Sequence, residues 1–188
     1  EVRWDPASGC PASIRFTPPL RLKAEGPEAA AREALERVAP LFGKLAHDLQ
    51  LEAPEPKLRV LSVQPFGDER HVRFEQRLGD VPLDGARLVV SLTRVERAIV
   101  VRAISGRAYQ DAPPALPAGT CPGEAARPVF TPRGGAWRLA WRTSGLTAGV
   151  PVEVLTADDG EELSREETAD RGTATGTVYP RARTGGAV

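Results

Sequence analysis

The 188-residue sequence has few of the residues from which catalytic sites are built. It contains two histidines, His47 and His71, and two cysteines, Cys10 and Cys121, without metal-ligand spacing between them. A His-Glu-x-x-His motif, which would place two zinc ligands and a general base on one helix, is missing. A Gly-x-Ser-x-Gly nucleophile elbow and a glycine-rich phosphate loop are missing as well. The sequence therefore predicts a non-catalytic chain without a metal site or a cofactor of its own.

Neither an excess of one charge nor a long hydrophobic run is present. The 25 basic and 25 acidic residues give a formal net charge of zero, whereas a nucleic-acid-binding domain usually shows a net basic face. The chain has no run of about 18 apolar residues, the length needed to span a bilayer. We therefore expect neither a nucleic-acid partner nor a membrane span.

The two cysteines lie far apart, in segments rich in proline and glycine. A disulfide between Cys10 and Cys121 would close a long loop, contribute about 4 kcal/mol, and require an oxidising compartment. The alternative is two unrelated thiols. Because both residues fall in expected loops without metal-ligand spacing, we favour the disulfide.

The pattern along the chain predicts a helix followed by strands. Pro27 suits the first turn of a helix, and Leu35, Val38, Phe42, Leu45 and Leu49 form one apolar stripe at helical spacing. Pro40 should kink or end this helix near Ala39. Strands are then expected over residues 58–65, 70–78, 83–93 and 98–105.

A second unit is expected after a segment rich in proline and glycine. Trp137, Leu139 and Trp141 alternate with polar residues, a second strand follows around Val152, and Asp158-Asp159-Gly160 is a strong turn before a polar edge strand over 161–169. The predicted fold class is α+β, with a helix packed on an antiparallel meander sheet and a second small antiparallel unit. The predicted division is a 1–24 arm, a 25–110 unit, a 111–135 linker, a 136–170 unit and a 171–188 tail.

The hairpin from His71 to Val90 is the most informative segment. Val72, Phe74, Gln76 and Leu78 share one strand face, so the polar Gln76 must find hydrogen-bond partners. Two partners are open to it, namely the hairpin loop or another protein. Glycines and a proline in the connection predict a loop of several residues, from Gly79 to Gly85.

This hairpin resembles the central hairpin of the fungalysin/thermolysin propeptide family, the amino-terminal prosegments of secreted zinc metalloproteases. The residues that make the resemblance are Phe74, Gln76, Gly79, Val81, Pro82, Leu83, Gly85, Ala86 and Leu88. The second unit is similar to the PepSY-type part of such prosegments, through Leu139, Ala140 and Trp141 and through the Gly160-Glu161 turn.

The resemblance implies a secreted or periplasmic prosegment that helps a thermolysin-like or fungalysin-like protease to fold and inhibits it until cleavage. The partner would be the cognate catalytic domain, and the implied zinc would belong to that domain. Arg181 and Arg183, in the glycine-flanked tail, are candidate processing residues. Two alternatives remain: a stand-alone secreted or periplasmic binding or inhibitor module, and a structural amino-terminal domain of a larger secreted protein.

Overall fold

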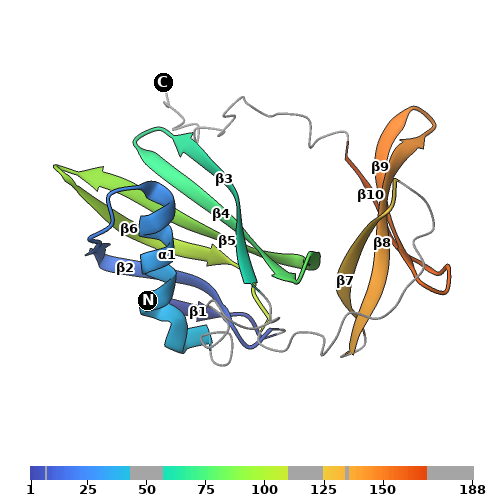
Figure 1. Cartoon of the computed structure of the whole chain (residues 1–188), viewed down its shortest axis with the longest axis horizontal. Coiled ribbons are helices and arrows are strands. Elements are labelled where there is room, and N and C mark those ends of the chain that lie inside the picture. The colour runs from blue at the N-terminus through green and yellow to red at the C-terminus, as the bar shows by residue number, and fades with distance from the viewer. Residues whose placement is uncertain (7, 43–56, 110–124, 134–135, 169–188) are drawn as a thin grey trace, which may run out of the picture. The chain divides into compact units, whose positions relative to one another are not determined.

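The computed structural model describes residues 1–6, 8–42, 57–109, 125–133 and 136–168. Strands make up 67% of these residues (Figure 1). No helix among them is long and apolar enough to cross a membrane. The elements are β1 (Val2–Trp4), β2 (Pro11–Arg21), α1 (Pro27–Val38), the 3-10 helix η1 (Ala39–Phe42), β3 (Lys57–Phe66), β4 (Glu69–Leu78), β5 (Val81–Val95), β6 (Ala98–Gly106), β7 (Arg127–Arg133), β8 (Ala136–Thr147), β9 (Val150–Ala157) and β10 (Glu162–Glu167).

The contacts between residues divide the chain into two compact units. The first comprises Glu1–Ala118 and Val129–Leu139, and the second comprises Gly119–Pro128 and Ala140–Val188. The finer division predicted from the sequence remains a prediction.

The predicted fold class, a helix packed on an antiparallel meander, is wrong. The described residues form ten strands and one α-helix, and their strand pairing is mixed rather than a simple meander. The predicted arm over 1–24 contains the strands β1 and β2, and β2 pairs with β6. β7 pairs in parallel with β5, at Leu83 and Phe130. Both pairings join segments far apart in the sequence, which local patterning does not reveal.

The first unit is an antiparallel sheet with α1 on one face. The order is β1-β2-β6-β5-β4-β3, and α1 contacts β3, β4, β5 and β6 (Figure 1). Small side chains on α1, the fully buried Ala30, Ala31 and Ala34, let the helix approach the sheet closely. Apolar side chains of the strands form the other half of this core, including Ile14, Val72, Phe74, Leu88, Val90 and Ile104.

The helix ends where Pro40 predicts. α1 stops at Val38, and η1 continues over Ala39–Phe42 after the Ala39 amide has bonded the Glu36 carbonyl. Proline lacks the N–H that would continue the α-helical ladder, so the chain changes to the tighter helix there. The prediction is confirmed as far as Phe42, while Leu45 and Leu49 lie outside the described residues.

The four predicted strands of the first unit are confirmed by β3, β4, β5 and β6, but the predicted long hairpin loop is wrong. Leu78 pairs directly with Val81, so the turn between β4 and β5 contains only Gly79 and Asp80. Gly79 has a φ of 56°, which a two-residue turn of this kind needs and glycine adopts without strain. The remaining residues of the expected loop belong to β5.

A bulge in β5 takes up the residues expected in the loop. Glu75 pairs with Arg87, whereas Arg77 pairs with Pro82, so residues 83–86 stand opposite Gln76 alone. Gly85 lies in this bulge with a φ of 69°. A bulge inserts extra chain into one strand and redirects its side chains. It therefore brings the glycine and proline of the sequence pattern next to Gln76.

The second unit contains the three strands predicted for it. β8 pairs with β9, and β9 pairs with β10, in both cases antiparallel. The turn at Asp158-Asp159-Gly160 is present, with Gly160 at a φ of 87° and its amide 3.0 Å from the Ala157 carbonyl oxygen. The Glu161 amide donates to Asp159 Oδ1 at 3.0 Å, the local bond that makes aspartate favourable in turns. Trp141, Val152, Leu155 and Leu163 are buried.

Candidate functional site

Gln76 connects the β4–β5 hairpin to the segment that follows β6. Its side chain has no exposed surface, its Nε2 donates to the Tyr109 carbonyl oxygen at 2.8 Å, and its Oε1 accepts from the Tyr109 amide at 2.9 Å. The side-chain amide thus pairs with both backbone groups of one residue, as a neighbouring strand would. The partner of Gln76 is therefore Tyr109, and not the hairpin loop.

Further contacts extend this connection within the first unit. The Tyr109 ring meets the Trp137 ring edge to face, with centroids 4.9 Å apart. Arg107 Nε donates to Asp5 Oδ2 at 2.8 Å. The hydrogen bond to the Tyr109 side chain, followed by the attraction of Asp5, raises the pKa of Arg107. We call Asp5, Gln76, Arg107, Tyr109 and Trp137 the Gln76 joint.

The remaining residues of the hairpin pattern are mainly buried around this joint. The buried members are Phe74, Val81, Leu83, Ala86 and Leu88, while Pro82 is half-buried, Gly79 is exposed in the β4–β5 turn and Gly85 is exposed in the bulge. In β8, Leu139, Ala140 and Trp141 are buried, whereas Gly160 and Glu161 lie at an exposed turn. The pattern is thus spread over two units, and most of its residues are buried.

The other predicted site residues are not brought together. Cys10 is fully buried, but Cys121 lies outside the described residues, so the disulfide remains a prediction. Arg181, Arg183 and His47 also lie outside them. His71 Nε2 is 3.2 Å from Glu69 Oε2, and within the described ranges no three His, Cys, Asp or Glu side chains form a metal-binding group.

The sheet face opposite α1 presents a second candidate surface. Residues on this face alternate with core residues along β2, β3, β4, β5 and β6, because successive side chains of a strand point to opposite faces. Pairing aligns them in three rows: Arg59, Glu75 and Arg87; then Ser62, Arg73, Val89, Ser105 and Ser13; then Gln64, His71, Ser91, Ala103 and Arg15. We call this surface the arginine face.

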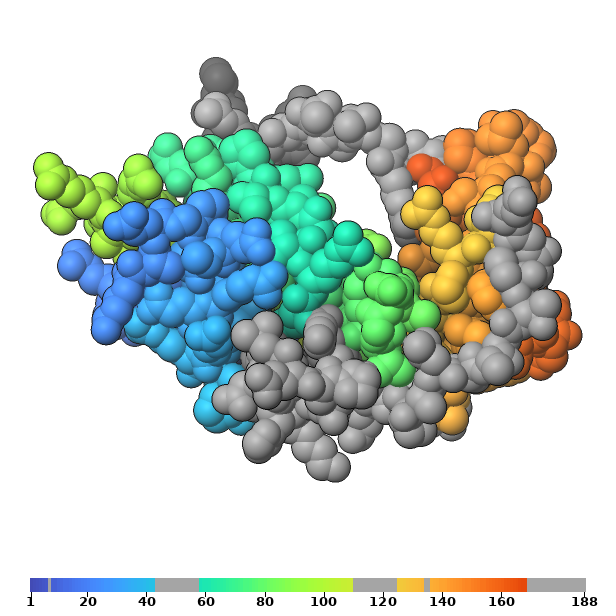
Figure 2. Space-filling view, in the orientation of Figure 1, coloured from blue at the N-terminus to red at the C-terminus, as the bar shows by residue number. Residues whose placement is uncertain are grey.

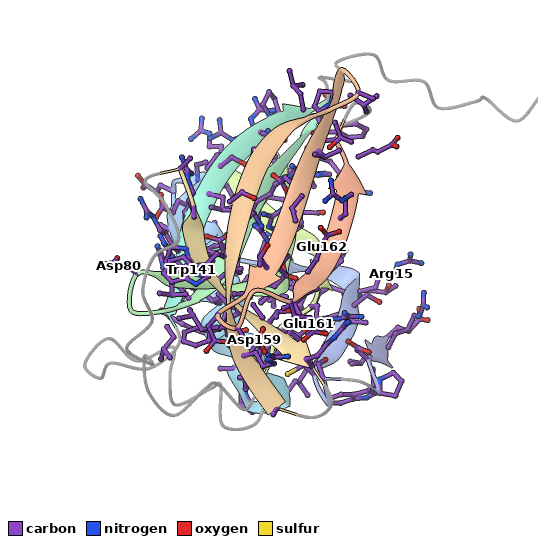
Figure 3. All side chains as sticks on the ribbon, turned by 90° about the vertical axis from the view of Figure 1, so that its right-hand side faces the viewer. Arg15, Asp80, Trp141, Asp159, Glu161 and Glu162 are labelled. Carbon is purple, nitrogen blue, oxygen red and sulfur yellow. The ribbon has the colours of Figure 1, made fainter. Side chains whose placement is uncertain are left out.

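The arginine face has small side chains at its centre and exposed arginines around them. Ser91, Ala103 and Ser105 lie near the middle, whereas Arg15 and Arg73 are exposed near the rim. Figure 3 shows Arg15 extending away from its strand. Such a polar surface suits contact with a protein better than capture of a small ligand, which prefers an apolar pocket.

The acidic residues of this face are paired with neighbouring cations. Glu75 lies 3.9 Å from both Arg77 Nε and Arg87 Nη2, and Glu69 lies 3.7 Å from Arg102 Nε. In contrast, Arg15, Arg59 and Arg73 form no ion pair with another described residue. The face is therefore positive toward solvent.

Sequence reasoning did not find this face. The alternation of charged and apolar residues is visible in each strand, but strand register decides which charged residues become neighbours. A formal net charge of zero conceals a local excess of arginine. Tyr109 was also missed, because nothing near it in the sequence points to Gln76.

No family model matches the sequence, and no curated protein matches it. A solved structure with some likeness is the Bacillus megaterium YpeB C-terminal domain, with 11% sequence identity and a TM-score of 0.42. The match covers 84% of this chain and 71% of that chain.

Proposed function

We propose that this chain is the prosegment of a secreted thermolysin-like or fungalysin-like zinc metalloprotease. It helps the catalytic domain to fold and inhibits that domain until cleavage. The zinc belongs to the catalytic domain, and the second unit acts as the PepSY-type part of the prosegment. The chain itself performs no catalysis.

The observation that best supports this proposal is the Gln76 joint. Gln76 and Gly85 belong to the hairpin pattern through which the sequence resembles these propeptides, and both lie at one bulge. A buried glutamine needs specific partners, and a glycine at positive φ relieves backbone strain. These two pattern residues thus serve one local structure, which supports reading the pattern as specific to a fold.

Mass action explains how such a domain could assist folding. A ligand that binds only the native protein stabilises it by RT ln(1 + [L]/Kd). A covalently attached domain acts at an effective concentration in the mM range. With a Kd of about 1 μM, the native protease would gain about 4 kcal/mol. After cleavage, dilution removes most of this gain and releases the inhibition.

The proposal is tested by adding the purified chain to thermolysin-like and fungalysin-like proteases, including the one encoded in the same precursor. We expect slower turnover of a peptide substrate and a higher yield of active protease after dilution from denaturant. A serine protease provides the control, and gel electrophoresis shows whether the chain merely competes as a substrate.

The two measurements separate the proposed function from its alternatives. Inhibition without a gain in refolding would favour a stand-alone inhibitor module. If neither inhibition nor a refolding gain occurs with any of these proteases, the prosegment proposal is wrong.

A further inference from the structure

Opposite charges are gathered on different units of this chain. The arginine face belongs to the first unit, while the β9–β10 hairpin of the second unit presents exposed acidic side chains. These are Asp158, Asp159, Glu161, Glu162, Glu166 and Glu167. Figure 3 labels three of them, Asp159, Glu161 and Glu162, on this hairpin. The formal net charge of zero thus combines a basic surface with an acidic one.

The sheet edges are poor sites for association by strand addition. Among the described strands, β1 pairs only with β2, β3 only with β4, and β10 only with β9, and β1 is only three residues long. β3 contains Pro65, and its register shifts between Val60 and Ser62, while β10 is mostly charged. Proline, bulges and charges are the usual means by which edge strands avoid pairing with other chains. A face, and not an edge, is therefore the better candidate for an interface.

We propose that the arginine face binds the β9–β10 hairpin of a second copy of this chain. The charges are complementary, and a net charge of zero means that two copies do not repel each other at long range. The minor charges match as well, since Glu75 lies among arginines on the face and Arg165 lies among carboxylates on the hairpin.

The mixed pattern argues against a nucleic acid on the same face. Glu69 and Glu75 would repel a phosphate backbone, whereas a protein hairpin with one arginine among acids tolerates them. The interface joins two different surfaces, so every bound copy still offers one free face and one free hairpin. Such heterologous contacts form rings or open chains instead of a closed symmetric pair.

The first experiment measures the molar mass of the full chain by sedimentation equilibrium over a range of protein concentrations. At about 20 mM salt we expect the average mass to rise with concentration. At about 500 mM salt, where charges are screened within a few ångströms, we expect the monomer alone. This measurement uses the unaltered chain and does not depend on any protease.

Charge reversal then tests which surfaces meet. Arg15→Glu with Arg73→Glu should abolish association, and so should Asp158→Lys with Glu167→Lys. An equimolar mixture of the two variants should associate again, because the unaltered hairpin of one variant meets the unaltered face of the other and the two reversed surfaces are also complementary. The matched control is Arg94→Glu with Arg97→Glu, near the projecting β5–β6 turn (Figure 2), which should associate like the unaltered chain.

Several outcomes would overturn the proposal. These are a monomer at all concentrations in low salt, association that survives either double reversal, and failure of the mixed variants to associate. A change of shape with salt at constant molar mass would indicate contact within one chain, which also contradicts it. If one double reversal fails to fold, the other still tests its own surface, and the salt series on the unaltered chain tests whether charge-driven association occurs at all.

Discussion

Replacing Gln76 by leucine should lower the stability of the first unit, because Gln76 holds the backbone of Tyr109, 33 positions later in the sequence. Leucine has nearly the same volume but forms no hydrogen bonds, so Gln76→Leu removes both bonds to the Tyr109 backbone. The Tyr109 amide and carbonyl would then lack the partners that they have in the native fold. The apolar cluster around Phe74 and Leu88 would still pack against the new side chain.

The magnitude follows from the cost of unpaired polar groups. Each backbone group left without a partner costs about 1–3 kcal/mol. Burial of the leucine side chain stabilises the fold by about 1–2 kcal/mol, which offsets part of this cost. Because Tyr109 is only half-buried and water can satisfy part of the loss, we expect a net destabilisation of about 2–3 kcal/mol. With a urea dependence of about 2 kcal/mol per M, the unfolding midpoint falls by about 1–1.5 M.

Urea unfolding followed by circular dichroism measures this change. Hydrogen exchange of the Tyr109 amide is the local readout and should speed up more than exchange in β4. The control is Gln64→Leu on the exposed side of β3, which should change stability by less than about 0.5 kcal/mol. Equal stability of Gln76→Leu and the unaltered chain, with unchanged exchange at Tyr109, would refute the assignment of Gln76 as the connecting residue.

Three further substitutions test other parts of the first unit. Gly106→Ala would place a Cβ 2.0 Å from the Arg87 carbonyl oxygen at a φ of 132°, so we expect the free energy of unfolding to fall by more than about 3 kcal/mol, with little soluble protein. The control Gly145→Ala, with open space around the new Cβ, should leave the thermal melting temperature nearly unchanged. Glu33 accepts hydrogen bonds from the Ala24 and Lys23 amides, which lower its pKa. The stabilisation of the fold by the ionised Glu33 is complete above the unfolded pKa and disappears as pH falls through the lower folded pKa. Glu33→Gln should therefore flatten the loss of stability below about pH 4.5 in acid titrations. Asp5→Asn weakens the pair with Arg107, and urea titration should show a cost below about 1 kcal/mol that shrinks in high salt. A larger, salt-independent cost would contradict a weak ion pair whose arginine is half-exposed.

Local features of the fold could be predicted from the sequence. Pro40 marks the end of α1, and alternation of apolar residues locates β3, β4, β5 and β6. The Asp158-Asp159-Gly160 turn and the strands on either side of it were also predictable. Each of these features is determined by residues within a few positions of one another, so it can be predicted from the local sequence alone.

Features that depend on distant pairing could not be predicted. β2 contains three prolines and looks irregular, yet its ends pair with β6 on either side of a register shift. The glycines and the proline between 79 and 85 suggest a loop, but the chain forms a tight turn and a bulge. Burial of Gln76 was foreseeable from its place on an apolar strand face. The partner of Gln76 could not be foreseen, because the position of Tyr109 depends on how β5 and β6 pair along their whole length.

The locations of the Gln76 joint and the arginine face determine where mutations can separate folding from function. Substitutions in the joint, such as Gln76→Leu, disturb packing and backbone pairing, so a loss of inhibition in those variants would not identify a contact with a protease. Arg15 and Arg73 lie outside the hairpin pattern, are exposed, and form no ion pair with another described residue. Their reversal should leave the unfolding midpoint nearly unchanged. A change in binding by these variants at unchanged stability would therefore report a surface contact directly.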